Sequence, residues 1–199
     1  MKVTKAQAQE NRAHIVATAS ALFRERGYDG VGIAELMAAA GFTHGGFYKH
    51  FRSKADLMAE AAATTISRAV ADSAGSTLAE FFKSYVSSVH RDARGVGCTM
   101  AALCGDAARQ SENVKSTFAA GIDSMVTTLL REVATPGDVD RREARAKVID
   151  SFAHAVGAVM LSRACPDDSA LADEILEVCR KEILASLLSP MHGTSVTAS

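Results

Sequence analysis

Apolar residues recur at intervals of three and four positions along almost the entire chain, and this spacing is the feature that most constrains the fold. In residues 6–26, for example, Ile15, Ala19, Leu22 and Phe23 form one apolar stripe. We find no segment with the alternation of apolar and polar residues that a half-buried strand requires. The pattern therefore predicts an all-α protein, and 199 residues are enough for one large core or two small ones.

Glycine and proline residues interrupt the periodic pattern and set the expected order of helices. The expected helices cover residues 6–26, 33–40, a short segment that starts after Thr43, 53–72, 77–94, 98–109, 114–135, 139–164 and 168–188. Residues 189–199 are polar, and we expect them to form a flexible tail.

The charged residues are unevenly distributed, although the formal net charge is only −1. Residues 1–54 contain eight Lys and Arg residues and four Asp and Glu residues, whereas the rest of the chain contains 14 and 19. A basic N-terminal segment joined to an acidic body indicates that the N-terminal segment binds a polyanion. A non-specific architectural nucleic-acid-binding protein would carry far more positive charge than this body does.

The segment GFTHGGFYKHFRSKADL, residues 41–57, places Gly45 and Gly46 directly ahead of an aromatic and basic cluster. Each glycine destabilises a helix interior by about 1 kcal/mol relative to alanine. Such a weakness makes physical sense if another backbone must come close, because a helix N-terminus without side chains presents its free N–H groups to an anion. Phe47 and Phe51, four positions apart, would offset the weakness by packing into a core.

The neighbouring segments complete a helix-turn-helix arrangement around these residues. The helix at 33–40 ends at Gly41, and Thr43 is the expected N-cap of the next helix. Ser53 and Asp56 then give the start signal of a long helix. Helix, turn and helix on a shared core is the arrangement of many DNA-binding proteins.

The segment GYDGVGIAELMAAAGFTHGGFYKHFRSKADL, residues 27–57, resembles the DNA-binding signature of the tetracycline-repressor (TetR) family of transcriptional regulators. The resemblance implies a homodimer whose third helices enter successive major grooves of double-stranded operator DNA, and whose body binds a small effector that releases the DNA. By motif position, the core residues are Phe47, Phe51 and Leu57. The residues that would face DNA are Thr43, His44, Gly45, Gly46, Tyr48, Lys49, His50 and Lys54.

Two of these residues have an alternative role that does not involve DNA. His50 could instead form hydrogen bonds within the domain, and Lys49 occupies a variable position that could simply be solvated. The chain also departs from the family pattern twice. Gly32 replaces the usual Thr or Ser cap of the second helix, and Ala34 replaces a frequent Arg or polar residue. The operator sequence is therefore not inherited from the family.

The resemblance and the helix pattern together predict three parts of the chain. Residues 1–52 would form a helix-turn-helix DNA-binding domain, residues 53–188 a larger helical effector-binding and dimerisation domain, and residues 189–199 the tail. The last two helices would pair with their symmetry mates through two apolar surfaces. The residues of these surfaces are Val148, Phe152, Val156, Val159 and Met160, with small neighbours between them, and Ile175, Leu176, Cys179, Ile183 and Leu187.

Aromatic and methionine residues of the body are the candidates for an effector cavity. They are Phe81, Phe82, Tyr85, Met100, Phe118, Met125 and Phe152. Ordinary core packing is the alternative for most of them, because such residues usually fill cores. His154, within an apolar run, is read as an interface histidine.

The four cysteines form no C-x-x-C pair and have no histidine spacing typical of zinc sites, so we expect no metal and no cofactor. Cys98 follows Gly95-Val96-Gly97 at an expected helix start, where backbone N–H groups would favour a reactive thiolate. A buried, inert thiol is the alternative. If Cys98 and Cys104 share one helix, about 9 Å of axial separation excludes a disulfide between them.

The sequence therefore predicts a ligand-responsive transcriptional regulator, in particular a repressor. The alternative is a helical-bundle enzyme or small-molecule carrier without a DNA-binding function. We find no G-x-S-x-G nucleophile, no Glu-x-x-His metal pattern and no phosphate-binding loop, and thus no catalytic residues. The uncharged runs are shorter than the roughly 20 residues that span a bilayer, and the N-terminus has no apolar segment, so we expect a cytoplasmic protein.

Overall fold

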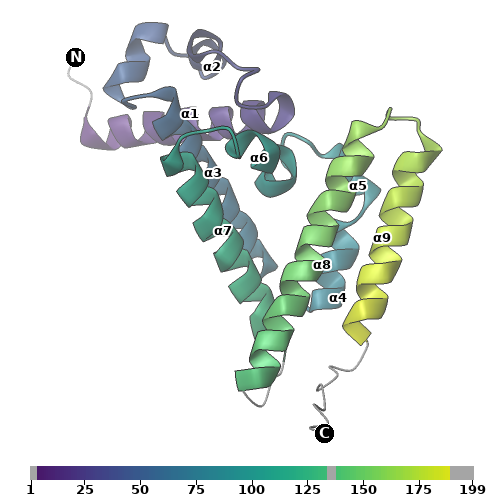
Figure 1. Cartoon of the computed structure of the whole chain (residues 1–199). Coiled ribbons are helices and arrows are strands. Elements are labelled where there is room, and N and C mark those ends of the chain that lie inside the picture. Colours follow the sequence, from purple (N-terminus) through teal and green to yellow (C-terminus); the bar gives the residue numbers. More distant parts are fainter. Residues whose placement is uncertain (1–3, 134–137, 189–199) are drawn as a thin grey trace, which may run out of the picture. The chain divides into compact units, whose positions relative to one another are not determined.

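The computed structural model describes residues 4–133 and 138–188, and the described chain is helical throughout, without strands (Figure 1). The all-α prediction is confirmed. The helices are α1 (Lys5–Arg26), α2 (Ile33–Ala39), the 3-10 helix η1 (His44–Lys49), α3 (Lys54–Ser73), α4 (Leu78–Tyr85), α5 (Ser88–Asp92), α6 (Thr99–Ala107), α7 (Glu112–Arg131), α8 (Asp138–Ala164) and α9 (Ala170–Leu188). None of the described helices is long and apolar enough to cross a membrane. The predicted tail at 189–199 lies outside the described residues.

The chain divides into two compact units. The first combines the residues up to Asp72 with Val89–Ser124, and the second combines Ser73–Ser88 with the residues from Met125 onward. The helix-turn-helix segment therefore belongs to the same unit as α3, α6 and most of α7. The functional division at residue 52 remains a prediction, because the two units are defined by their internal contacts and not by which residues bind DNA.

The first helix is fixed at both ends by local signals. Thr4 caps α1, since its hydroxyl accepts a hydrogen bond from the Gln7 N–H at 3.2 Å. Gly27 ends the helix with a φ of 75°, a left-handed conformation that favours glycine, and its N–H donates to the Phe23 carbonyl at 2.8 Å. The apolar stripe between these ends is buried, including Ile15 and Phe23, which have no exposed surface.

The start of α3 follows the sequence signal, because the Asp56 N–H donates to the Ser53 hydroxyl at 3.1 Å. The helix then packs in the first unit, where the hydroxyl oxygens of Thr65 on α3 and Thr99 on α6 lie 2.7 Å apart. Leu57 is fully buried, as predicted. α3 is thereby joined both to the helix-turn-helix segment and to α6.

The predicted single helix at 77–94 is wrong. The structure contains α4, which begins with a capping box between Thr77 and Glu80, and the separate short helix α5. Val86 ends α4 with φ −92° and ψ 69°, is fully buried, and accepts a hydrogen bond from Arg180 of α9 through its carbonyl at 3.3 Å. The backbone turns at Val86, where it packs inside the second unit. The apolar spacing of the sequence continues through this turn, so it does not reveal the break between the two helices.

In the second unit, α8 and α9 lie side by side (Figure 1) and are joined by a hydrogen bond from the Ser162 hydroxyl to the Ala172 carbonyl at 2.8 Å. Several residues predicted to contact a second copy are instead buried within this unit, among them Val148, Phe152, Val159, Leu176 and Ile183. One of them, Phe152 of α8, lies against α4, with its ring 5.9 Å from the Tyr85 ring. The large apolar side chains that remain exposed on α8 and α9 are Ile149, Met160, Leu161, Leu171, Val178 and Leu188.

Candidate nucleic-acid interface

The glycine-rich segment forms a six-residue 3-10 helix, η1, rather than an α-helix. Thr43 is its N-cap, with an extended backbone, but the Thr43 side chain makes no capping hydrogen bond, contrary to expectation. The Gly46 N–H donates to the Thr43 carbonyl instead, at 2.9 Å, and the Phe42 N–H donates to the Met37 carbonyl of α2 at 2.8 Å. The backbone of the turn, not a side-chain cap, therefore fixes where η1 begins.

Two phenylalanines anchor η1 to the core. Phe47 is fully buried and Phe51 is 3% exposed, and their ring centroids lie 5.5 Å apart. This confirms the predicted core role of both residues. Because the inward side of η1 is filled by these rings, Tyr48 and Lys49 face outward.

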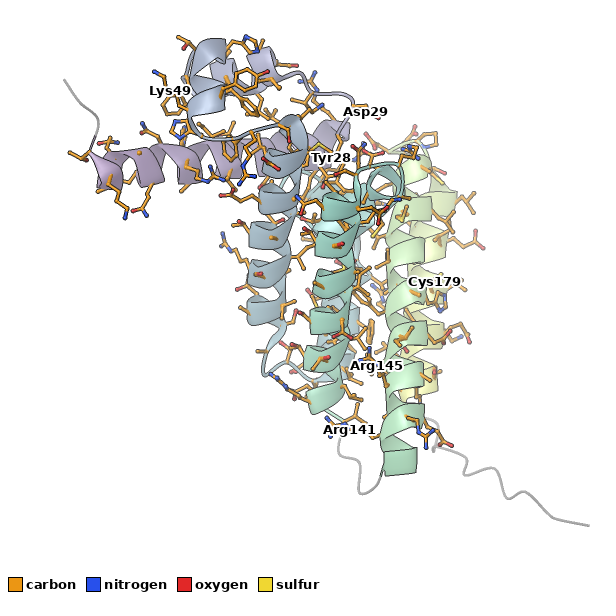
Figure 2. The ribbon with its side chains drawn as sticks, turned by 60° about the vertical axis from the view of Figure 1, so that its left-hand side comes forward. Tyr28, Asp29, Lys49, Arg141, Arg145 and Cys179 are labelled. Atoms are coloured by element: carbon orange, nitrogen blue, oxygen red, sulfur yellow. The ribbon has the colours of Figure 1, made fainter. Side chains whose placement is uncertain are left out.

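The outward residues include most of those predicted to face DNA. Tyr48 is 65% exposed, with its ring edge-on to Phe47 at 5.2 Å and near His44 at 6.4 Å. Lys49 is also exposed and lies at the periphery of the first unit (Figure 2). An aromatic ring held out of the core beside cationic donors is suited to contacts with phosphates and base edges. The exposed candidates are Thr43, His44, Gly45, Tyr48 and Lys49, and the half-buried ones are Gly46, His50 and Lys54.

The fold itself does not require the two glycines. A Cβ atom built on Gly45 would meet nothing within 4 Å, and one built on Gly46 would meet Met37 Cε at 3.6 Å, an ordinary contact. Neither residue has a positive φ. The space beside Gly45 is therefore open to an external molecule.

Lys54 and His50 are partly engaged inside the first unit. The Lys54 ammonium donates to the Tyr28 carbonyl at 2.5 Å and lies 5.9 Å from the Phe23 ring, which leaves further N–H donors for another partner. The His50 ring lies 6.4 Å from Phe42. Burial lowers the pKa of His50, and the nearby charges of Arg12 and Lys49 lower it further. In the free protein, His50 therefore favours its neutral form more than an unperturbed histidine does.

Arg12 of α1 reaches the same region, although it belongs to no recognisable sequence motif. Its guanidinium donates to the His50 carbonyl and to the carboxylate of Glu60 on α3, with a distance of 3.0 Å from Nε to Glu60 Oε1. The guanidinium also lies 4.2 Å from the centroid of the Phe51 ring. The sequence feature that indicates its place near the core is its position three residues before Ile15, at the edge of the apolar stripe of α1.

The two departures from the family pattern lie at the start of α2. Gly32 is the N-cap residue and provides no side-chain hydrogen bond to the helix. Ala34 is exposed, and the adjacent Glu35 pairs with Arg26 at 2.5 Å. The first turn of α2 therefore presents a methyl group where a polar contact residue would stand.

The seven effector candidates do not gather in one place. Met100 and Phe118 are buried in the first unit, whereas Phe82, Tyr85, Met125 and Phe152 are buried in the second unit and Phe81 is half-buried there. The structure brings four of them together, since the Phe81 ring lies 5.1 Å from Phe82, 5.4 Å from Tyr85 and 6.4 Å from Phe152. Their role in binding an effector remains a prediction.

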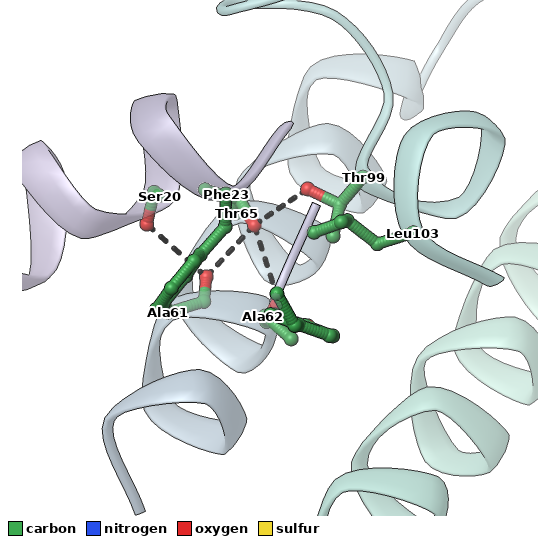
Figure 3. Close-up of a pocket in the computed structure, with 8 residues that line it drawn as sticks. Ser20, Phe23, Ala61, Ala62, Thr65, Thr99 and Leu103 are labelled. Atoms are coloured by element: carbon green, nitrogen blue, oxygen red, sulfur yellow. Dashed lines mark hydrogen bonds between the residues drawn. The ribbon is translucent and has the colours of Figure 1, made fainter. Parts of the chain in front are cut away.

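A narrow pocket lies in the first unit (Figure 3), and none of the seven candidates lines it. The hydroxyl groups of its serine and threonine residues are bonded within the protein, as when Thr65 donates to the Ala61 carbonyl at 2.8 Å. The buried Tyr28 hydroxyl has no hydrogen-bond partner among the described residues, and burial raises its pKa. The space is too narrow to admit a water molecule, so we interpret it as imperfect packing. The lining residues are Ser20, Phe23, Tyr28, Ala61, Ala62, Thr65, Thr99 and Leu103.

Cys98 is the N-cap residue of α6, as expected from its position after the glycines. Its N–H donates to His90 Nε2 at 3.0 Å, and its side chain is half-buried. Burial, with a smaller contribution from Cys98, raises the pKa of Cys104 to about 11, and burial also raises the pKa of Cys179. All four cysteines are free, and no group of three metal-ligating side chains is suitably placed within 4–133 and 138–188.

Comparisons with known proteins match this arrangement. The model of the family described as bacterial regulatory proteins, tetR family, matches residues 15–61. The chain is 44% identical over 57 residues to the HTH-type transcriptional regulator AcrR of Shigella flexneri, covering 29% of this chain and 26% of that protein. It is 42% identical over 45 residues to the HTH-type transcriptional repressor NemR of Escherichia coli K12, covering 23% of each. The matches thus span about a quarter of these relatives' own length.

Solved structures extend the likeness to the whole fold. A TetR transcriptional regulator from Chloroflexus aurantiacus superposes with a TM-score of 0.68 at 25% identity, over 92% of this chain and 96% of the other. The reduced form of E. coli NemR gives a TM-score of 0.67 at 19% identity, over 87% and 95%.

The buried phenylalanines, the turn after α2 and the exposed side of η1 define a helix-turn-helix protein with a helical body. Residues 15–61 match the tetR family of bacterial regulatory proteins, and the fold of the chain is that of solved TetR-type transcriptional regulators.

Proposed function

We propose that the protein is a DNA-binding transcriptional regulator, and specifically a repressor that a small molecule releases from its operator. The observation that supports this most is η1, which exposes Tyr48 and Lys49 beside two glycines that the fold does not need. An open backbone at Gly45, flanked by an aromatic side chain and cationic donors, fits a phosphate backbone and the base edges next to it.

The relatives support a regulator rather than an enzyme. Both curated relatives described above are HTH-type regulators, and NemR is a repressor. The segment that matches the family model, residues 15–61, contains η1, which is the part of this chain that would contact DNA. A protein acting on chromosomal operators in a bacterium works in the cytoplasm.

We further propose that the protein acts as a homodimer through α8 and α9. Ile149, Met160 and Leu161 on α8 are 45%, 38% and 61% exposed, and Leu171 and Val178 on α9 are 55% and 52% exposed. Large apolar side chains concentrated on two neighbouring helices favour a four-helix interface with a second copy. A dimer would also set its two η1 helices about 34–36 Å apart, the spacing of successive major grooves.

The effector would bind in the helical body, and the aromatic group of Phe81, Phe82, Tyr85 and Phe152 is our candidate for contacting it. These side chains are largely apolar, so the effector they suit is an apolar or aromatic small molecule. The effector would release DNA only if it binds the DNA-free conformation of the protein more tightly than the DNA-bound conformation.

The direct test of DNA binding uses Tyr48→Ala. The operator is first selected from genomic fragments by the wild-type protein in the presence of competitor DNA. The substitution removes only an exposed ring, so we expect an unchanged melting temperature and a loss of operator affinity of about 10- to 100-fold, measured by fluorescence anisotropy. The matched control is Val96→Ala, an exposed side chain outside η1. Equal operator affinities of wild type and Tyr48→Ala would contradict the assignment of η1.

A further inference from the structure

η1 has little intrinsic stability, although it would present the residues that contact DNA. It is only six residues long, 3-10 helices have poor hydrogen-bond geometry, and the Thr43 side chain does not cap it. Its anchors from within are the rings of Phe47 and Phe51. These rings fix the depth of η1 in the core, but an additional contact is needed to fix the backbone at its end.

Arg12 supplies a contact at that end. His50 is the C-cap residue of η1, and its carbonyl accepts a hydrogen bond from Arg12 of α1. The same guanidinium is paired with both carboxylate oxygens of Glu60 on α3, and it stacks 4.2 Å from the Phe51 ring centroid. One side chain thus joins α1, the end of η1 and α3.

We propose that Arg12 is a positioning residue for DNA binding, which holds the C-terminal end of η1 against α1 and α3 so that Tyr48 and Lys49 meet the DNA at the required angle. This inference rests on the proposed function. Arg12 acts through the His50 carbonyl, Glu60 and Phe51, and it does not itself contact DNA.

The chemistry of the contact requires arginine. The planar guanidinium presents its N–H groups in a rigid fork, which allows a two-point pair with the Glu60 carboxylate while another N–H reaches a carbonyl. A lysine at this position would keep the charge but could not make the same set of directed bonds. The substitution Arg12→Lys therefore separates geometry from charge.

Glu60 distinguishes a positioning role from a direct phosphate contact. If Arg12 bound phosphate, removing Glu60 would free the guanidinium and remove a negative charge, and both effects would strengthen DNA binding. If Arg12 positions η1, removing Glu60 loosens the guanidinium and weakens DNA binding. The two roles predict opposite signs for Glu60→Ala.

The experiment measures operator affinity by fluorescence anisotropy between about 50 and 200 mM salt. We expect Arg12→Lys and Glu60→Ala each to weaken binding about tenfold, with the salt slope unchanged because the number of neutralised phosphates is the same. Two control variants are matched to them. Glu10→Ala removes an exposed carboxylate of α1, and Arg68→Ala removes one partner of an exposed ion pair on α3.

A second measurement reports on η1 without DNA. We expect faster amide hydrogen exchange at His50 and Phe51, whose N–H groups donate to the Phe47 carbonyl, in Arg12→Lys and Glu60→Ala but not in the controls. Unaltered exchange and affinity in both variants, or tighter DNA binding by Glu60→Ala, would overturn the positioning role alone. Failure of the wild-type protein to bind any DNA fragment specifically would overturn the proposed function, and this inference with it.

Discussion

At the scale of single residues, environment decides how the same side-chain type is used. Phe47 and Tyr48 are neighbours, yet one is fully buried and the other is 65% exposed. Arg12 and Arg26 lie on one helix, but Arg12 is bonded to three other groups across the first unit whereas Arg26 forms an exposed pair with Glu35. Exposed pairs of this second kind contribute little to stability.

We predict that DNA binding depends on pH through His50. Its pKa lies below the usual value of about 6.5 in the free protein, because of burial and the charges of Arg12 and Lys49. A DNA phosphate beside the ring would raise this pKa, so binding would take up a proton and operator affinity would rise as the pH falls from about 7.5 to 6.

The control for this prediction is His50→Gln, since the first unit also contains other histidines, among them His14 and His44. The pH dependence assigned to His50 is the difference between wild-type and variant affinities. The folding stability of the free protein has the opposite pH dependence to the operator affinity. Because the unfolded chain takes up the proton first, the contribution of His50 to stability is present above about pH 6.5 and is lost as the pH falls further. Identical pH profiles for wild type and variant would contradict a phosphate contact by His50.

Cys98 is expected to be the thiol that is alkylated first. Cys104 and Cys179 have raised pKa values because of burial, which keeps their reactive thiolate forms scarce, and the Cys165 thiol donates to the Leu161 carbonyl at 3.5 Å. Cys98 lies at the N-terminus of α6, where backbone N–H groups favour an anion.

The measurement is limited iodoacetamide treatment at pH 7.5 followed by peptide mapping, with Cys98→Ser as the control. Faster labelling of any other cysteine would refute the assignment. Operator binding is measured before and after treatment. Labelling of Cys98 without a change in affinity would show a reactive thiol with no regulatory role.

At the scale of helices, the weak element is the one proposed to bind DNA. α1 and α3 begin with side-chain caps, whereas η1 is a short 3-10 helix without one. Its glycines lower stability without an internal reason. This pattern is expected where function, rather than folding, selects the residues.

The variants Gly45→Ala and Gly46→Ala separate the effect of the glycines on folding stability from their effect on DNA binding. The new Cβ atoms meet at most ordinary contacts within the protein, so we expect the melting temperature to stay the same or to rise by a few degrees. The methyl group would stand between η1 and DNA, so operator affinity should fall about tenfold or more. The measurement is thermal denaturation together with fluorescence anisotropy, and Gly105→Ala on α6, where a Cβ also meets nothing, is the control. Full operator affinity in both variants would remove the argument from close approach.

At the scale of the molecule, the exposed apolar side chains of α8 and α9 predict that the protein forms a dimer. Leu161 is 61% exposed in the single chain. Because a charge buried in an apolar interface is strongly unfavourable, Leu161→Glu should convert a micromolar dimer to a monomer in sedimentation velocity. Val96→Glu, at an exposed position outside the second unit, should leave the dimer intact. A monomeric wild-type protein would contradict the interface, as would a Leu161→Glu variant that sediments as a dimer.

The sequence alone determined the all-α class, most helix boundaries and the helix-turn-helix segment, because these depend on local signals. Periodicity places Ile15 and Phe23 on one stripe, and the serine of Ser53 starts α3 through its own hydroxyl. The same locality explains why residues 27–57 were enough to indicate the family: the turn, the two anchoring phenylalanines and the exposed residues between them are consecutive in the chain.

Only the tertiary structure decided features that depend on residues far apart in the chain. The break at Val86 follows from its burial and its bond to Arg180, 94 residues away, which no local pattern contains. The contact of Arg12 with His50 and Glu60 spans 38 and 48 residues. Periodicity likewise marks Val148 and Met160 as apolar helix positions of one kind, and it cannot tell a side chain buried within the chain from one left for a second copy. Packing makes that distinction, because it depends on which other helices cover each face.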